Sequence, residues 1–165
     1  AMVMIGHGKL ADELKARAAG LPVVFTGFIE DRATLARTLA SCDLYVSAMP
    51  SETFGVSVIE AQACGLPVIG VAGGEMTARV PPGTGLLGPV GDPAAMAANV
   101  VAMWRGDWQA AGRAGRALVE SRYDWSATFD RLFGEIYPAA LAKAQARVAR
   151  GPVLMPVTRL LRGTA

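Results

Sequence analysis

Histidine and cysteine are scarce in this chain of 165 residues, which has one histidine and two cysteines. A single histidine argues against a Ser-His-Asp hydrolase, and the sequence has neither a GxSxG elbow nor a GxxxxGKS/T phosphate loop. Cys42 and Cys64 lie in apolar segments without metal-ligand spacing. We therefore expect two buried, reduced thiols rather than a disulfide, and no metal site.

Charge and long apolar runs are also scarce. Charged residues make up 18% of the chain and the formal net charge is +2, which gives no basic footprint for nucleic acid. No apolar run approaches the roughly 20 residues of a membrane-spanning helix, and the first residues lack a signal-peptide pattern. We expect a cytoplasmic protein. The basic stretch 138–165 could contact the inner membrane face or a partner domain, although a solvated tail is the default.

Apolar residues are abundant, at 52%, and they form short strand-like runs that alternate with helical stretches. We expect strands at 2–5, 22–28, 43–47 and 67–71, with a short edge strand at 86–90. The strands are apolar runs without period-two alternation, which indicates a parallel sheet covered by helices on both faces. The prediction is an α/β fold, with a single Rossmann-like domain over residues 1–137 and a helical extension with a tail at 138–165.

Two helix starts carry capping signals. Asp31 directly precedes the helix expected at 32–40, and Asp92, followed by Pro93, precedes the one expected at 94–104; an aspartate at such a position accepts hydrogen bonds from the first turn. Further helices are expected at 10–19, at 108–122, and at 127–137 with continuation to about residue 150. Trp125, Phe129 and Phe133 recur at helical spacing in the last of these, and we interpret that stripe as packing rather than as a ligand box.

The segments that follow the strands contain glycine and acidic residues. They are Gly6-His7-Gly8, Gly27 with Phe28, residues 50–55, and Gly73-Gly74-Glu75. In parallel sheets ligands bind at the carboxyl ends of the strands, so we expect these four segments to converge on one edge. A lone GxG is a weak phosphate signal, and His7 is interpreted as an exposed loop residue.

Residues 51–75 organise the chain. Glu52 and Glu60 are eight positions apart, and a helix is expected to start near Thr53 and Gly55. Helix N-termini attract phosphate, and Glu60 would lie about 5–9 Å further along the axis, beside a ribose. This spacing suggests a nucleotide-sugar site. Each glutamate also has a simpler interpretation: a helix-surface ion pair for Glu60 and a partner of the helix dipole for Glu52.

The same stretch resembles the retaining glycosyltransferases of the GT-B fold, family 4 or group 1, which include bacterial mannosyltransferases. The family pattern is a small residue, Glu, seven residues and a second Glu, then A-x-A-x-G-x-P-V and a GG-x-x-E-like turn. The residues that match it are Ser51, Glu52, Phe54, Gly55, Glu60, Ala61, Ala63, Gly65, Pro67, Val68, Gly73, Gly74 and Glu75. Weaker matches extend the resemblance over roughly residues 2–137.

The resemblance implies that the chain is the C-terminal, donor-binding half of a GT-B enzyme. Glu52 would contact the transferred sugar and is the implied catalytic residue, and Glu60 would bond the ribose hydroxyls. The implied donor-binding residues are Gly6, Gly8, Gly27, Phe28, Ser51, Thr53, Phe54, Gly55, Val56 and Glu60. The reaction would need no metal or other cofactor, and the donor would be GDP-mannose or a UDP-hexose.

The chain also departs from the family. It lacks the acceptor-binding domain that comes first in complete enzymes, and the Arg and Lys that neutralise the diphosphate have no match here. It is therefore expected to be a fragment or one half of a split enzyme, inactive by itself and dependent on the missing N-terminal domain. A non-catalytic nucleotide-sugar binding module and, less well supported, a sugar-nucleotide epimerase stay open as alternatives.

Overall fold

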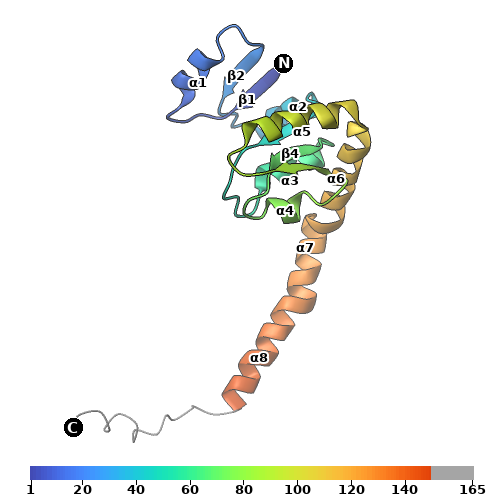
Figure 1. Cartoon of the computed structure of the whole chain (residues 1–165). Helices are drawn as coiled ribbons and strands as arrows, with labels where there is room; N and C mark the ends of the chain where they lie inside the picture. The colour runs from blue at the N-terminus through green and yellow to red at the C-terminus, as the bar shows by residue number, and fades with distance from the viewer. Residues whose placement is uncertain (150–165) are drawn as a thin grey trace, which may run out of the picture. The chain divides into compact units, whose positions relative to one another are not determined.

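The structure is a computed structural model that describes residues 1–149 (Figure 1). By its internal contacts the chain divides into two compact units, Ala1–Glu120 and Ser121–Ala165. The predicted tail beyond residue 150 lies outside the described residues. The predicted division after Tyr137 stays a prediction; Tyr137 is the first residue of a helix that follows directly on a π-helical turn.

The first unit opens with a parallel pair of strands. Strands β1 (Met2–Ile5) and β2 (Val23–Gly27) are joined by helix α1 (Ala11–Arg17), and Met2 pairs with Val23. Apolar strand residues remain exposed here, among them Met2 at 50% and Val24 at 56%. The prediction that both faces of the sheet are covered therefore does not hold for β1 and β2. An apolar run of residues does not by itself determine which element packs over it.

A second sheet holds β3 (Tyr45–Ser47), β4 (Val68–Val71) and β5 (Gly85–Gly88), all parallel, in the order β3-β4-β5. The α/β fold with parallel pairing is confirmed, but the single sheet is not: among the described residues, the strands form two sheets. The edge position of β5 was predicted. All four residues of the central strand β4 are buried, so the expectation of a doubly covered strand holds there.

Helices α2 (Arg32–Ala40), α3 (Val56–Ala63), α4 (Met76–Arg79), α5 (Pro93–Arg105) and α6 (Trp108–Arg122) complete the first unit (Figure 1). Helix α3 contributes to both core clusters: Val58 packs with Val68 and Met76, and Ala61 packs with Leu39 and Leu66. Their spacing of three residues places Val58 and Ala61 on one helix face. Val56 and Ala63, apolar residues of the same helix, lie on the exposed side.

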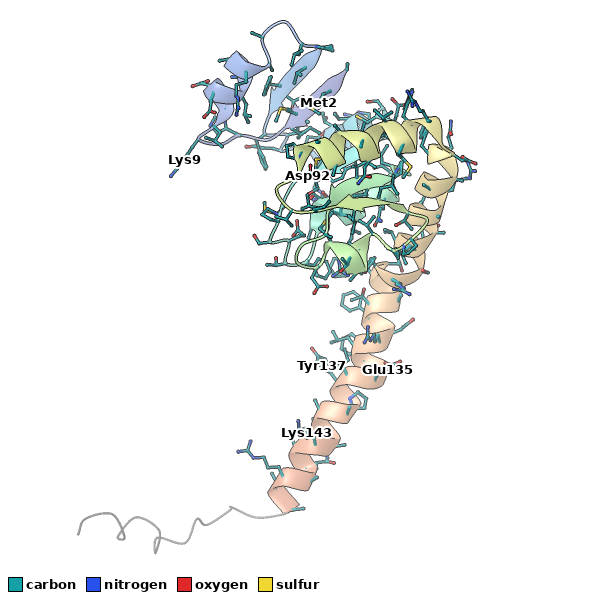
Figure 2. All side chains as sticks on the ribbon, viewed as in Figure 1. Met2, Lys9, Asp92, Glu135, Tyr137 and Lys143 are labelled. Atoms are coloured by element: carbon teal, nitrogen blue, oxygen red, sulfur yellow. The ribbon has the colours of Figure 1, made fainter. Side chains whose placement is uncertain are left out.

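Both predicted caps are present. The Asp31 carboxylate accepts a hydrogen bond from the backbone N–H of Thr34 at 2.7 Å, and Asp92 accepts one from Ala95 at 2.9 Å (Asp92 is labelled in Figure 2). The hydroxyl and N–H of Thr34 hold the pKa of Asp31 below its usual value. Helix α3 starts differently, since its N-cap is Gly55 with φ +79°, a conformation that glycine adopts without steric cost.

The second unit contains α7 (Trp125–Arg131), a π-helical turn η1 (Leu132–Ile136) and α8 (Tyr137–Ala149). The rings of Trp125, Phe129 and Phe133 stack at centroid distances of 5.6 and 6.0 Å, and Tyr137, labelled in Figure 2, meets Phe133 edge-on. Trp125 is nevertheless 73% exposed and Phe133 60%. Within the second unit the rings pack on one another along their own helix, and the interpretation of the stripe as packing rather than a ligand box stays a prediction.

Both cysteines are free thiols, as predicted, but they are half-buried rather than buried. Burial raises the pKa of Cys64, Glu60 adds to the rise, and Arg116 opposes it.

We expect alkylation of Cys64 in a Cys42→Ala variant to reach its half-maximal rate at a higher pH than alkylation of the same thiol in urea. The pH profile of iodoacetamide labelling, read by mass spectrometry, tests this. Superimposable folded and unfolded profiles would contradict it.

Candidate functional site

The loop between β3 and α3 folds around the carboxylate of Glu52. One oxygen, Oε1, accepts hydrogen bonds from the backbone N–H groups of Thr53, Phe54 and Gly55 at 3.1, 3.4 and 2.9 Å. Three converging N–H groups at the start of a helix form an anion site, and the positive end of the helix dipole adds to it. In the chain without ligand, Glu52 is therefore the dipole partner that its simpler interpretation describes.

The turn after β4 packs closely against the backbone of this loop. The N–H of Glu75 donates to the carbonyl oxygen of Glu52 at 2.8 Å. Gly73 and Gly74 lie so close that a Cβ atom would come within 2.3 Å of the Pro50 oxygen and 2.2 Å of the Glu52 oxygen, respectively. The two glycines thus permit the close approach of two backbone segments. The structure brings together these predicted parts of the site.

Glu60, the other predicted acidic residue, is the fifth residue of α3. Its Oε1 atom lies 2.9 Å from Nη2 of Arg32, and the two side chains are 24% and 81% exposed. The simpler interpretation, an ion pair at the helix surface, is thus observed. An ion pair with one exposed partner contributes at most about 1 kcal/mol, so a ligand can compete for this carboxylate.

Four further predicted residues lie at or just after the ends of β1 and β2: Gly6, Gly8, Gly27 and Phe28. The N–H of Gly6 donates to the carbonyl oxygen of Gly27 at 2.8 Å, which brings these two glycine turns together. Phe28 is 73% exposed. Because β1 and β2 form a separate sheet from β3 and β4, the four segments do not lie on the edge of a single sheet, and their convergence on one site stays a prediction. The roles of Gly6, Gly8, Gly27 and Phe28 stay predictions.

One residue of this site was missed by the sequence analysis. Arg79, the last residue of α4, donates from Nε to the carbonyl oxygen of Phe54, and its guanidinium carbon lies 4.4 Å from the centroid of the Phe54 ring. No motif marks it. An arginine near a helix C-terminus is ordinarily explained by the helix dipole, so only the contact across 25 positions of sequence identifies it.

Residues 1–149 contain no group of three or more histidine, cysteine, aspartate or glutamate side chains placed to hold a metal ion. No helix in this part of the chain is both long and apolar enough to cross a membrane.

Comparisons with known proteins agree with the predicted family. The family described as "Glycosyl transferases group 1" matches residues 1–105. The chain is 46% identical over 68 residues to a GDP-mannose-dependent alpha-(1-6)-phosphatidylinositol dimannoside mannosyltransferase of Mycobacterium tuberculosis (strain ATCC 25177 / H37Ra), covering 41% of this chain and 18% of that protein. It is 32% identical over 146 residues to a sulfoquinovosyl transferase of Arabidopsis thaliana, covering 85% of this chain and 28% of that protein.

Among solved structures, the fold is similar to that of a sucrose-phosphate synthase from Thermosynechococcus elongatus. The TM-score is 0.72 and the identity 28%, over 86% of this chain and 38% of that one. The chain thus spans well under half the length of each of these relatives.

Proposed function

The chain belongs to the group 1 glycosyl transferases, and we propose that it is the donor-binding part of a retaining enzyme that uses a nucleotide-diphospho-sugar to make α-glycosides. The observation that carries the proposal is the set of three N–H groups, from Thr53, Phe54 and Gly55, aimed at one carboxylate oxygen before α3. A phosphate oxygen has the same charge sign and accepts the same bonds.

Donor binding would then exchange one anion for another. The diphosphate takes the N–H groups that Glu52 occupies in the chain without ligand, and the freed Glu52 carboxylate contacts the transferred sugar as the catalytic residue. Glu60, further along α3, exchanges its Arg32 partner for the ribose hydroxyls. N–H groups aimed at the diphosphate stabilise the charge that grows on it as the glycosidic bond to phosphate breaks.

The acceptor side of the reaction is proposed to belong to a further domain that this chain does not contain, because the relatives are more than twice as long. The mannosyltransferase relative is named for GDP-mannose, which makes GDP-mannose the first donor to test, with UDP-hexoses second. The same coverage leaves one alternative, a non-catalytic nucleotide-sugar binding module that works with a partner.

A thermal-shift panel of GDP, UDP and ADP, each with and without its sugar, tests the proposal. A nucleotide at ten times its Kd adds about 1.4 kcal/mol to the unfolding free energy, which is a rise of about 3–6 °C for a domain of this size. We expect Glu60→Ala to lose most of that rise because the ribose contact is gone.

The control is Arg32→Ala, which breaks the same ion pair and leaves the carboxylate in place. It should keep the nucleotide-dependent rise and lower the unfolding free energy by less than about 1 kcal/mol. Equal losses in the two variants would assign Glu60 to the ion pair alone. The absence of any rise in the wild-type chain would contradict nucleotide binding.

A further inference from the structure

Arg79 holds the Phe54 residue by two different groups. Its Nε atom donates a hydrogen bond to the Phe54 carbonyl oxygen, and its guanidinium group lies over the Phe54 ring at 4.4 Å. A cation over an aromatic face contributes about 0.5–1 kcal/mol at exposed sites and more where water is excluded. Arg79 is half-buried. Its two contacts together fix both the main chain and the ring of Phe54.

The position of Arg79 is itself determined by α3. Its carbonyl oxygen accepts a hydrogen bond at 2.8 Å from Nε2 of Gln62, and Gln62 is fully buried. The side-chain stem of Arg79 also borders the loop, since a Cβ atom at Gly55 would lie 3.3 Å from its Cγ atom. Arg79 therefore contacts both helix α3 and the loop that precedes α3.

The orientation of one peptide group follows from these contacts. The carbonyl of Phe54 and the N–H of Gly55 belong to the same planar, trans peptide, so they point in opposite directions. Holding the carbonyl on the Arg79 side turns the N–H toward Glu52, and this bond, at 2.9 Å, is the shortest of the three to its carboxylate. Since glycine tolerates many backbone conformations, Gly55 alone would not prevent this peptide from rotating.

We propose that Arg79 is a positioning residue that orients the Phe54–Gly55 peptide, so that the Gly55 N–H faces the anion site and sets the affinity for the donor diphosphate. It acts through this peptide and not by touching the donor. The assignment of the anion as a diphosphate rests on the proposed function. The orientation of the peptide does not.

The first test uses the whole chain without ligand. In ¹H–¹⁵N NMR spectra, we expect the Gly55 amide proton to lie downfield in the wild type and to move upfield in Glu52→Gln, which weakens the acceptor. Arg79→Met, which keeps the stem and removes the donor and the charge, should move it in the same direction and speed its hydrogen exchange about tenfold. Arg79→Lys should restore part of the effect.

Arg105→Met is the matched control, because Arg105 also ends a helix and is exposed, but belongs to α5. It should leave the Gly55 resonance in place. An unchanged Gly55 amide in a folded Arg79→Met variant would overturn the proposal. If that variant does not fold, a Gly55 resonance of Arg79→Lys that lies between those of the wild type and Glu52→Gln would support the proposal, and one at the wild-type position would overturn it.

The second test measures the Kd of the nucleoside diphosphate that stabilises the wild type. Arg79→Met should weaken binding about tenfold, and Arg105→Met should leave it unchanged. Equal Kd values for wild type and Arg79→Met would overturn the proposal. If the wild type binds no nucleotide, the proposed function fails, and the ligand-free spectra still decide whether Arg79 orients the peptide.

Discussion

Replacing Gly112 by alanine is expected to lower the free energy of unfolding by about 2–3 kcal/mol, although alanine is the better helix former by about 1 kcal/mol. Gly112 lies in α6, and a Cβ atom there would come within 2.0 Å of the carbonyl oxygen of Gly65 and 3.3 Å of Pro67. The obstacle is backbone, which cannot turn away as a flexible side chain can. Helix α6 would have to move off the turn between α3 and β4.

Chemical denaturation of wild type and variant measures this effect. Gly134→Ala is the control, since Gly134 also lies in a helical segment but an added Cβ atom there meets nothing within 4 Å. It should change the unfolding free energy by less than about 1 kcal/mol. Equal effects at the two positions would show that helix propensity, and not the Gly65 contact, determines the outcome.

Replacing Gly74 by alanine is expected to have the second large effect, a loss of about 3 kcal/mol. Two costs combine. The residue has φ +53°, where an L-amino acid costs about 1–2 kcal/mol, and its Cβ atom would overlap the Glu52 oxygen at 2.2 Å and the Glu52 nitrogen at 2.8 Å. Because the overlap falls on the backbone of Glu52, the loop before α3 should shift and weaken nucleotide binding as well.

Gly91→Ala separates the two costs. Gly91 has φ +78°, and nothing lies within 4 Å of its added Cβ atom, so it measures the conformational cost alone. We expect a melting temperature intermediate between wild type and Gly74→Ala, with nucleotide binding intact. If Gly91→Ala destabilises the chain as much as Gly74→Ala, the close approach of the turn to Glu52 contributes nothing.

Both glutamates of the candidate site have bonding partners in the chain without ligand. Glu52 bonds the N–H groups of its own loop, and Glu60 forms an ion pair with Arg32, so a ligand would have to displace these partners. These partners keep the acidic groups satisfied, and each is weak enough to be displaced, since the loop bonds are local and the Arg32 side chain is largely exposed. The structural and the functional interpretations of each glutamate are therefore compatible.

Apart from the four-residue helix α4, which was not predicted, the order of strands and helices was predictable because it depends on neighbours in sequence. Asp31 and Asp92 stand one residue before their helices, and a cap needs only the first turn that follows it. The parallel α/β class followed from continuous apolar runs alternating with helical stretches. The family was predictable too, since its pattern of two glutamates and flanking glycines lies within residues 51–75.

Contacts between distant segments were decided only by the tertiary structure. Four features depend on which surfaces meet in space. They are the division into two sheets, the exposure of the Trp125 stripe, the Arg32–Glu60 ion pair and the contacts of Arg79 with Phe54. Local periodicity determines which side of a helix or strand is apolar. It does not determine what that side packs against, because this choice belongs to the packing of the whole chain.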